Sequence, residues 1–302
     1  MVNNLHYKCS FIFIIKNPMH YHKKILQLFI LFYSAIFFTQ SYKQDTLRGE
    51  FTYQLKAKFD IRTDYRHEEF FTLLIGENRA FFASKNSLKR DSVLDNSRVT
   101  THNSDGSITL GIKNGTSTPE TNFHFTVIQS NETIQYFAPV VMSLLTYKEP
   151  IIKHWKLINE SKIINTINCK RAEVTFKGRN WIAWYSPEIP LPYGPYKFSG
   201  LPGLIVKITD EKGDYDFEMV KSVSDSKLKG KLITIRKSRY NEAIETTQQK
   251  LKQALRNADA NSAAILASYG TTIIKGQEMV RQREKEREEN KKYENPIELE
   301  KD

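Results

Sequence analysis

Arg179 and the aromatic side chains that follow it are the residues whose types and spacing best suit ligand binding. Arg179 and Glu188 bracket a short apolar segment that contains Trp181 and Trp184. A guanidinium can fork onto a carboxylate while an indole ring stacks on an apolar surface. We therefore hypothesise a ligand site at the mouth of a sheet. An equally supported alternative is an Arg179–Glu188 ion pair that ties the following loop to its strand.

That following loop, residues 186–203, holds five of the ten prolines of the chain and three glycines. Each proline removes a backbone donor and fixes φ, so the segment is neither a helix nor a central strand but a long, stiff loop. Tyr193, Tyr196 and Phe198 bring aromatic surface to it, and a rigid aromatic loop suits recognition because little entropy is lost on binding. The interpretation we favour is that the loop folds back and these aromatics fill one end of the sheet.

Signals for catalysis and metal binding are weak in this sequence. No histidine has metal-ligand spacing, and the segment 67–69 (His-Glu-Glu) suits a surface turn. There is no Gly-x-Ser-x-Gly elbow and no phosphate-binding loop. Cys169 suits a small core residue, because a nucleophile would need a histidine brought close by folding. We predict no catalytic residues, no metal and no cofactor.

The elements that position these residues are mostly strands. Residues 51–59 alternate apolar and polar at period two, residues 70–75 and 79–82 suit a hairpin, and the pattern continues at 107–112, 123–129 and 133–137. Sequential strands joined by short turns usually pair antiparallel. The fold class predicted is mainly β, with a curved, half-barrel-like antiparallel sheet.

The C-terminal part of the chain changes period. Ile244, Leu251, Leu255 and Ala258 lie on one helical stripe within residues 240–258, which predicts an amphipathic helix packed on the sheet. The run 281–289 carries both charge signs and almost no apolar residue. It predicts a charged helical or disordered tail over residues 276–302.

The N-terminal part has the layout of a secretory signal peptide. A basic stretch from Met19 precedes an apolar run over residues 25–38, with small residues up to Ser41. That run is shorter than the roughly 20 residues a membrane span needs. We expect residues 1–18 to be an extension or a misassigned start, residues 19–41 the signal peptide and residues 42–275 one β-rich domain, with no membrane span in the mature chain.

The net charge of the expected mature chain limits the classes of partner that it could bind. The formal charge is +11, and the segment up to Ser41 contains four lysines and no acid, so +7 remains. These basic residues are scattered singly, which disfavours nucleic acid. A peptide or a lipid stays a candidate ligand.

The hexapeptide Gly200-Leu201-Pro202-Gly203-Leu204-Ile205 resembles the name-giving motif of the GLPGLI family. The segments 170–172, 176–179, 183–190 and 194–198 resemble the pattern of the family in order, and 295–299 resembles its usual ending. The resemblance covers most of residues 48–300 and is strongest over 155–210. It implies an exported protein of the Gram-negative envelope, in the periplasm or at the outer membrane, without established catalytic residues. Association of some members with outer-membrane transport systems makes such a transporter a candidate partner.

The function expected from these observations is a non-catalytic envelope protein that binds a ligand or assists an outer-membrane transport system. One alternative is an envelope hydrolase whose catalytic residues are dispersed in sequence. Another is an interaction scaffold without a small-molecule site.

Overall fold

The computed structural model of the protein describes residues 45–102, 104, 108–113, 115–141, 143–223, 225–233, 240–261, 282, 285, 286 and 288–299. The chain divides into two compact units, Met1–Lys43 and Gln44–Asp302. The predicted signal peptide and the extension before it fall in the first unit, outside the described residues. No described helix is long and apolar enough to cross a membrane.

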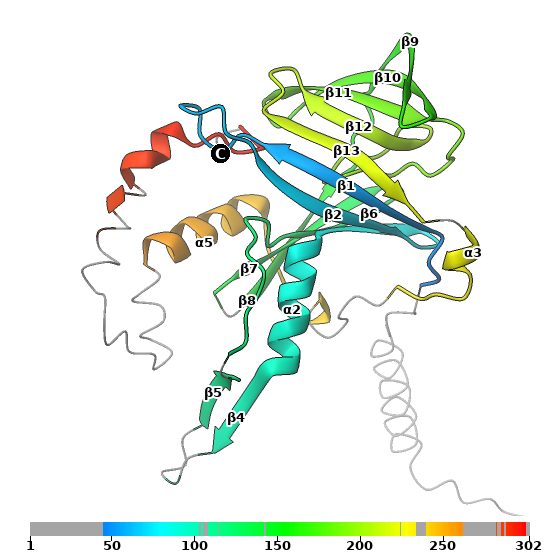
Figure 1. Cartoon of the computed structure of the whole chain (residues 1–302). Coiled ribbons are helices and arrows are strands. Elements are labelled where there is room, and N and C mark those ends of the chain that lie inside the picture. The colour runs from blue at the N-terminus through cyan, green and yellow to red at the C-terminus, as the bar shows by residue number, and fades with distance from the viewer. Residues whose placement is uncertain are drawn as a thin grey trace, which may run out of the picture. The chain divides into compact units, whose positions relative to one another are not determined.

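Twelve strands of the second unit form one curved, unclosed sheet (Figure 1). All neighbouring strands pair antiparallel except β14 and β8, which pair parallel. The order across the sheet is β14-β8-β7-β6-β3-β2-β1-β13-β12-β11-β10-β9. The strands are β1 (Gly49–Ala57), β2 (His67–Ile75), β3 (Arg79–Ser84), β6 (Thr126–Ser130), β7 (Thr133–Val140), β8 (Ser143–Pro150), β9 (Lys156–Ile164), β10 (Ile167–Phe176), β11 (Arg179–Ser186), β12 (Leu204–Asp210), β13 (Tyr215–Ser222) and β14 (Ile244–Glu245). The predicted fold class is confirmed.

Aromatic side chains dominate the core of this sheet. In β1 the alternating residues Phe51, Tyr53 and Leu55 are buried, as the period of two predicted. Phe71 of β2 stacks on Phe82 of β3 with ring centroids 4.8 Å apart, across the predicted hairpin. Because β1 pairs with both β2 and β13, the beginning and the later part of the domain share one core.

Helix α2 (Lys85–Ser97) was not predicted from the sequence. The hydroxyl of Ser84 accepts a hydrogen bond from the backbone N–H of Ser87 at 3.1 Å, which satisfies a free donor at the start of the helix. Strands β4 (Arg98–His102) and β5 (Ile108–Ile112) follow as a separate two-stranded hairpin. The predicted strand near residue 107 therefore exists, but outside the main sheet. Figure 1 shows α2 and this hairpin extending away from the sheet.

The predicted C-terminal helix is shorter than expected. Helix α5 (Gln248–Ala260) begins where Thr247 caps it, and Leu251 is buried against β7 and β8. Ile244 lies in β14 and is exposed instead of joining the helical stripe. The β-branched residues 244, 246 and 247 favour extended backbone, so the chain pairs with β8 before it turns helical. Two further short helices among the described residues are α3 (Asp225–Leu228) and the 3₁₀ helix η1 (Lys291–Tyr293).

The charged tail is only partly a solvated segment. Its described residues between 282 and 290 are helical and exposed. After η1, however, the chain returns to the domain, and Asn295 is buried. Residues 294–299 of the predicted charged tail are extended and not helical, and they find polar partners inside the domain.

Candidate functional site

The proline-rich loop, residues 186–203, connects the paired strands β11 and β12 and packs into the core. Tyr193, Tyr196 and Phe198 are all buried in the main apolar cluster. The side-chain amide of Gln129 donates to the carbonyl oxygens of Gly194 and Tyr196, both at 2.7 Å. The interpretation of the loop aromatics as core residues is therefore confirmed.

The glycines of the hexapeptide motif let this loop approach the backbone of neighbouring segments. Gly203 has φ +151°, and a Cβ there would lie 2.1 Å from the carbonyl oxygen of Ser186. Gly200 has φ +89°, and its Cβ would lie 2.7 Å from the carbonyl oxygen of Ile152. Only glycine tolerates such backbone angles and contacts. Together with the buried Leu201, the motif fixes the loop against the sheet.

Arg179, the first residue of β11, is an internal anchor. Only 2% of its side chain is exposed. Its guanidinium donates to the carboxylate of Asp210 at 2.8 Å and to the side-chain oxygen of Asn295 at 2.6 Å. It also donates to the backbone carbonyl oxygens of residues 296 and 297, at 2.7 and 3.2 Å. Every guanidinium nitrogen is thus committed within the chain, and we replace the ligand-fork hypothesis with this anchoring role.

The alternative Arg179–Glu188 ion pair is not formed. Arg179 is the first residue of β11 and Glu188 lies two residues beyond its last, and a strand rises about 3.3 Å per residue, so the two are far apart. Glu188 instead accepts a hydrogen bond from the side-chain amide of Asn168 at 2.9 Å. Trp181 is buried with its ring centroid 4.5 Å from that of Phe198. Trp184 is buried as well, beneath the ammonium of Lys162 at 5.3 Å. These rings serve the core more than an open site.

Lys197 forms the centre of a buried ionic group that we call the lysine cluster. Its side chain is 0% exposed, and its ammonium lies 2.8 Å from Glu149 and 2.7 Å from the hydroxyl of Tyr147. It also contacts the carboxylate of Glu298. The ring centroids of Tyr136, Tyr147 and Tyr196 lie 4.9, 5.2 and 5.3 Å from the ammonium, within cation–π range.

The surroundings favour the charged forms of Lys197 and Glu298. Burial by itself lowers the pKa of Lys197, but the two carboxylates together outweigh it and raise that pKa above its usual value. Burial likewise acts to raise the pKa of Glu298, whereas Lys197 and hydrogen bonds lower it below its usual range. Sequence reasoning missed this cluster, whose signal is a lysine set between two buried aromatics in a stiff loop.

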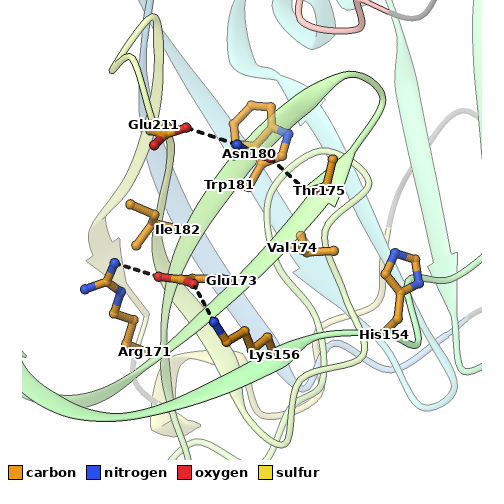
Figure 2. A pocket seen from close by; sticks show the side chains of 10 residues that line it. All are labelled: His154, Lys156, Arg171, Glu173, Val174, Thr175, Asn180, Trp181, Ile182 and Glu211. Carbon is orange, nitrogen blue, oxygen red and sulfur yellow. Dashed lines mark hydrogen bonds and ion pairs between the residues drawn. The ribbon is translucent and has the colours of Figure 1, made fainter.

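A depression of about 520 Å³ lies on the sheet where β9, β10 and β11 meet (Figure 2). We call it the outer depression. Its polar side chains form two linked groups: Asn180 bonds Glu211 at 3.0 Å and Thr175 at 2.8 Å. Glu173 contacts Arg171 at 2.7 Å and Lys156 at 3.8 Å. The other lining residues are His154, Val174, Trp181 and Ile182. The depression therefore presents both charge signs beside apolar surface.

Strand β9 borders this depression and forms one end of the sheet. Among the described residues it pairs with β10 alone. At the other end of the sheet, the two-residue strand β14 covers β8, which α5 also contacts. The side chains of Leu157 and Ile163 in β9 are 57% and 70% exposed. An edge strand offers unpaired backbone donors and acceptors to another chain.

The residues considered for catalysis in the sequence analysis lie within the main sheet. Residues 67–69 lie in β2 and not in a surface turn. Glu69 is buried, and its carboxylate accepts hydrogen bonds from the hydroxyls of Ser84 and Thr121, the latter at 2.6 Å. His67 contacts the same carboxylate at 3.1 Å, so Ser84 and His67 both bond the acid. Cys169 is a buried core residue, as predicted, and burial raises the pKa of its thiol to about 11.

The described residues contain no group of three or more His, Cys, Asp or Glu that could hold a metal ion.

Comparison with known proteins gives one family and one distant structural likeness. Residues 154–207 match the model of a family described as a protein of unknown function, Porph_ging. This match fits the expectation of a family without established function, over the stretch where we expected the strongest resemblance. No curated protein matches the chain.

Two solved structures of PNGF-II, in the P21 and C2 space groups, are each 13% identical to this chain. Their TM-scores are 0.47 and 0.46. Each match covers 70% of this chain and 33% of the PNGF-II chain, so this chain spans about a third of that length.

Proposed function

We propose that this chain is an exported protein of the cell envelope that binds an extended segment of a protein partner without catalysing a reaction. The partner we propose is a component of an outer-membrane transport system. The observation that carries the binding proposal is the exposed edge of β9 beside the outer depression.

An edge strand binds a partner by adding a strand to the sheet. Main-chain hydrogen bonds give the affinity, and pockets for alternate side chains give the specificity. The nine residues of β9 offer such a ladder, and the exposed side chains of Leu157 and Ile163 add apolar surface near its two ends. The outer depression, which Lys156 links to β9, supplies the pocket.

The charges of the outer depression suit a polypeptide. A carboxylate of the partner would compete with Glu173 for Arg171 and Lys156, and an ammonium would compete with Arg171 for Glu173. Figure 2 shows these side chains side by side along β10 and β9. Both signs within one depression favour a segment with mixed side chains over a ligand of one charge.

Site-specific photo-crosslinking in cells tests this proposal. A photo-reactive residue at position 157 or 163 should give a covalent adduct with one outer-membrane transport component, identified by mass spectrometry. Positions 70 and 220 are matched controls, because Phe70 and Val220 are exposed apolar residues on β2 and β13. Equal adducts from all four positions, or none from β9, would contradict the proposal.

Export of the chain is part of the same proposal. The compact unit that contains all the described residues begins at Gln44, just after the expected cleavage at Ser41. Asp45 already belongs to the fold, since its carboxylate accepts from the backbone N–H of Glu77 at 2.8 Å and contacts Arg79 at 3.2 Å. Sequencing of the purified envelope protein should begin at Tyr42, and a mature chain that retains residues 19–41 would refute cleavage.

A further inference from the structure

The last described residues, Glu294–Leu299, which we call the C-terminal strap, bind to the domain as an extended peptide would. The backbone N–H of Asn295 donates to the carbonyl oxygen of Phe59 at 2.8 Å. The backbone N–H of Leu299 donates to the carbonyl oxygen of Lys177 at 2.9 Å. Figure 1 shows the C-terminal end of the chain lying beside the end of β1. These bonds fix the strap at both ends on segments far from it in sequence.

The domain forms hydrogen bonds with both polar atoms of the Asn295 side chain. The amide oxygen accepts from Arg179 at 2.6 Å, and the amide nitrogen donates to the carbonyl oxygen of Lys58 at 2.8 Å. The backbone carbonyl of the same residue accepts from the hydroxyl of Tyr215 at 2.6 Å. An aspartate would place a negative charge against the Lys58 carbonyl, and an alanine would leave Arg179 without one acceptor.

Three residues later, the domain binds the carboxylate of Glu298. Glu298 accepts from the hydroxyl of Tyr196 at 2.7 Å and from the amide of Gln248 at 2.9 Å, and it contacts Lys197. Between the two recognised side chains, the carbonyl of Pro296 accepts from Arg179. Proline fixes φ, so the strap loses less conformational entropy when it binds.

We propose that these groups form a peptide-binding site with specificity for an extended Asn-Pro-x-Glu segment, and that the C-terminal strap is its displaceable occupant. A covalent connection holds the strap at an effective concentration on the order of millimolar, which keeps the site filled in cis. The occupant in trans is the same segment of a second copy of this chain. This site shares no residue with the β9 edge, so it stands or fails separately from the proposed function.

A cleavable full-length chain tests the proposal. A site for a specific protease is placed between Lys285 and Glu286, which are both exposed. After cleavage, the fragment that carries the strap should co-elute with the domain at micromolar concentration. A labelled synthetic peptide of residues 286–302 should then exchange into the domain.

Peptide variants establish specificity. Asn295→Ala and Glu298→Ala peptides should bind roughly 30-fold more weakly or worse, because each loses a charge-assisted hydrogen bond to a buried partner. The Leu299→Ala peptide is the matched control, since Leu299 is exposed, and it should exchange like the wild-type peptide. Equal exchange of all peptides would overturn the proposal. Unfolding of the domain once its fragment leaves would also overturn it, because the strap would then be an integral part of the fold.

Discussion

Replacement of Lys197 by methionine should lower the free energy of unfolding by about 3–5 kcal/mol at pH 7, because it removes from a buried ionic group the cation that contacts both Glu149 and Glu298. Lys177, which lies 3.3 Å from Glu149, would remain. Methionine has a similar volume, so the loss is electrostatic more than steric. Glu149 and Glu298 would then face each other largely buried and without their shared partner. Urea unfolding followed by circular dichroism measures the difference.

The loss should depend on pH in a defined way. The pKa of Glu298 is lowered in the folded protein. Its contribution to the free energy of unfolding is therefore present above the unfolded pKa of about 4.3 and vanishes as the pH falls through the folded pKa. The pKa of Lys197 is raised, so its contribution is present below about 10.4 and vanishes as pH rises through the folded value. The variant should therefore lose most between these limits and approach wild type in acid.

Lys148→Met provides the matched control. Lys148 contacts Glu245 at 3.3 Å, but half of its side chain is exposed, and such surface pairs contribute about 1 kcal/mol or less. A Lys197→Met variant that behaves like this control at pH 7, or whose loss grows in acid, would contradict the role assigned to the lysine cluster.

Local patterns were sufficient for several strands and for the proline-rich loop. The alternation in β1, the hairpin of β2 and β3 and the stiff loop before β12 each depend on neighbours in sequence. Helix α2 was not predicted, because only Ser87 of its thirteen residues is buried and its sequence therefore shows no apolar stripe. Its available signal was Ser84 as a capping residue.

The candidate sites depend on partners distant in sequence. Arg179 was singled out as a ligand-binding residue, whereas its partner Asn295 lies 116 residues away, and no spacing rule connects them. Lys197 contacts one acid from β8 and another from the C-terminal strap, so its burial depends on how the curved sheet and the strap pack around the loop. The edge position of β9 likewise follows from strand order, which sequence periodicity does not determine.

Replacement of Arg179 by methionine should also cost about 3–5 kcal/mol, because the buried carboxylate of Asp210 would lose its cation and Asn295 its charged donor. The chain after η1 should loosen, which hydrogen exchange at residues 294–299 would detect as lost protection. Arg179→Lys keeps the charge but not the planar fork, so it should recover only part of the stability.

Arg48→Met is the control for this change, because Arg48 pairs with Glu77 at the surface, 3.6 Å apart, and such surface pairs contribute about 1 kcal/mol or less. If Arg179→Met left residues 294–299 protected, the remaining contacts of the strap, with the lysine cluster, Lys58 and Tyr215, would be sufficient to hold it. If protection vanished in Arg179→Met and persisted in Lys197→Met, the asparagine end would dominate the binding of the strap. The two substitutions together therefore separate the contributions of the two ends of the strap. This separation holds where the two ends act independently, because only then do their free-energy changes add.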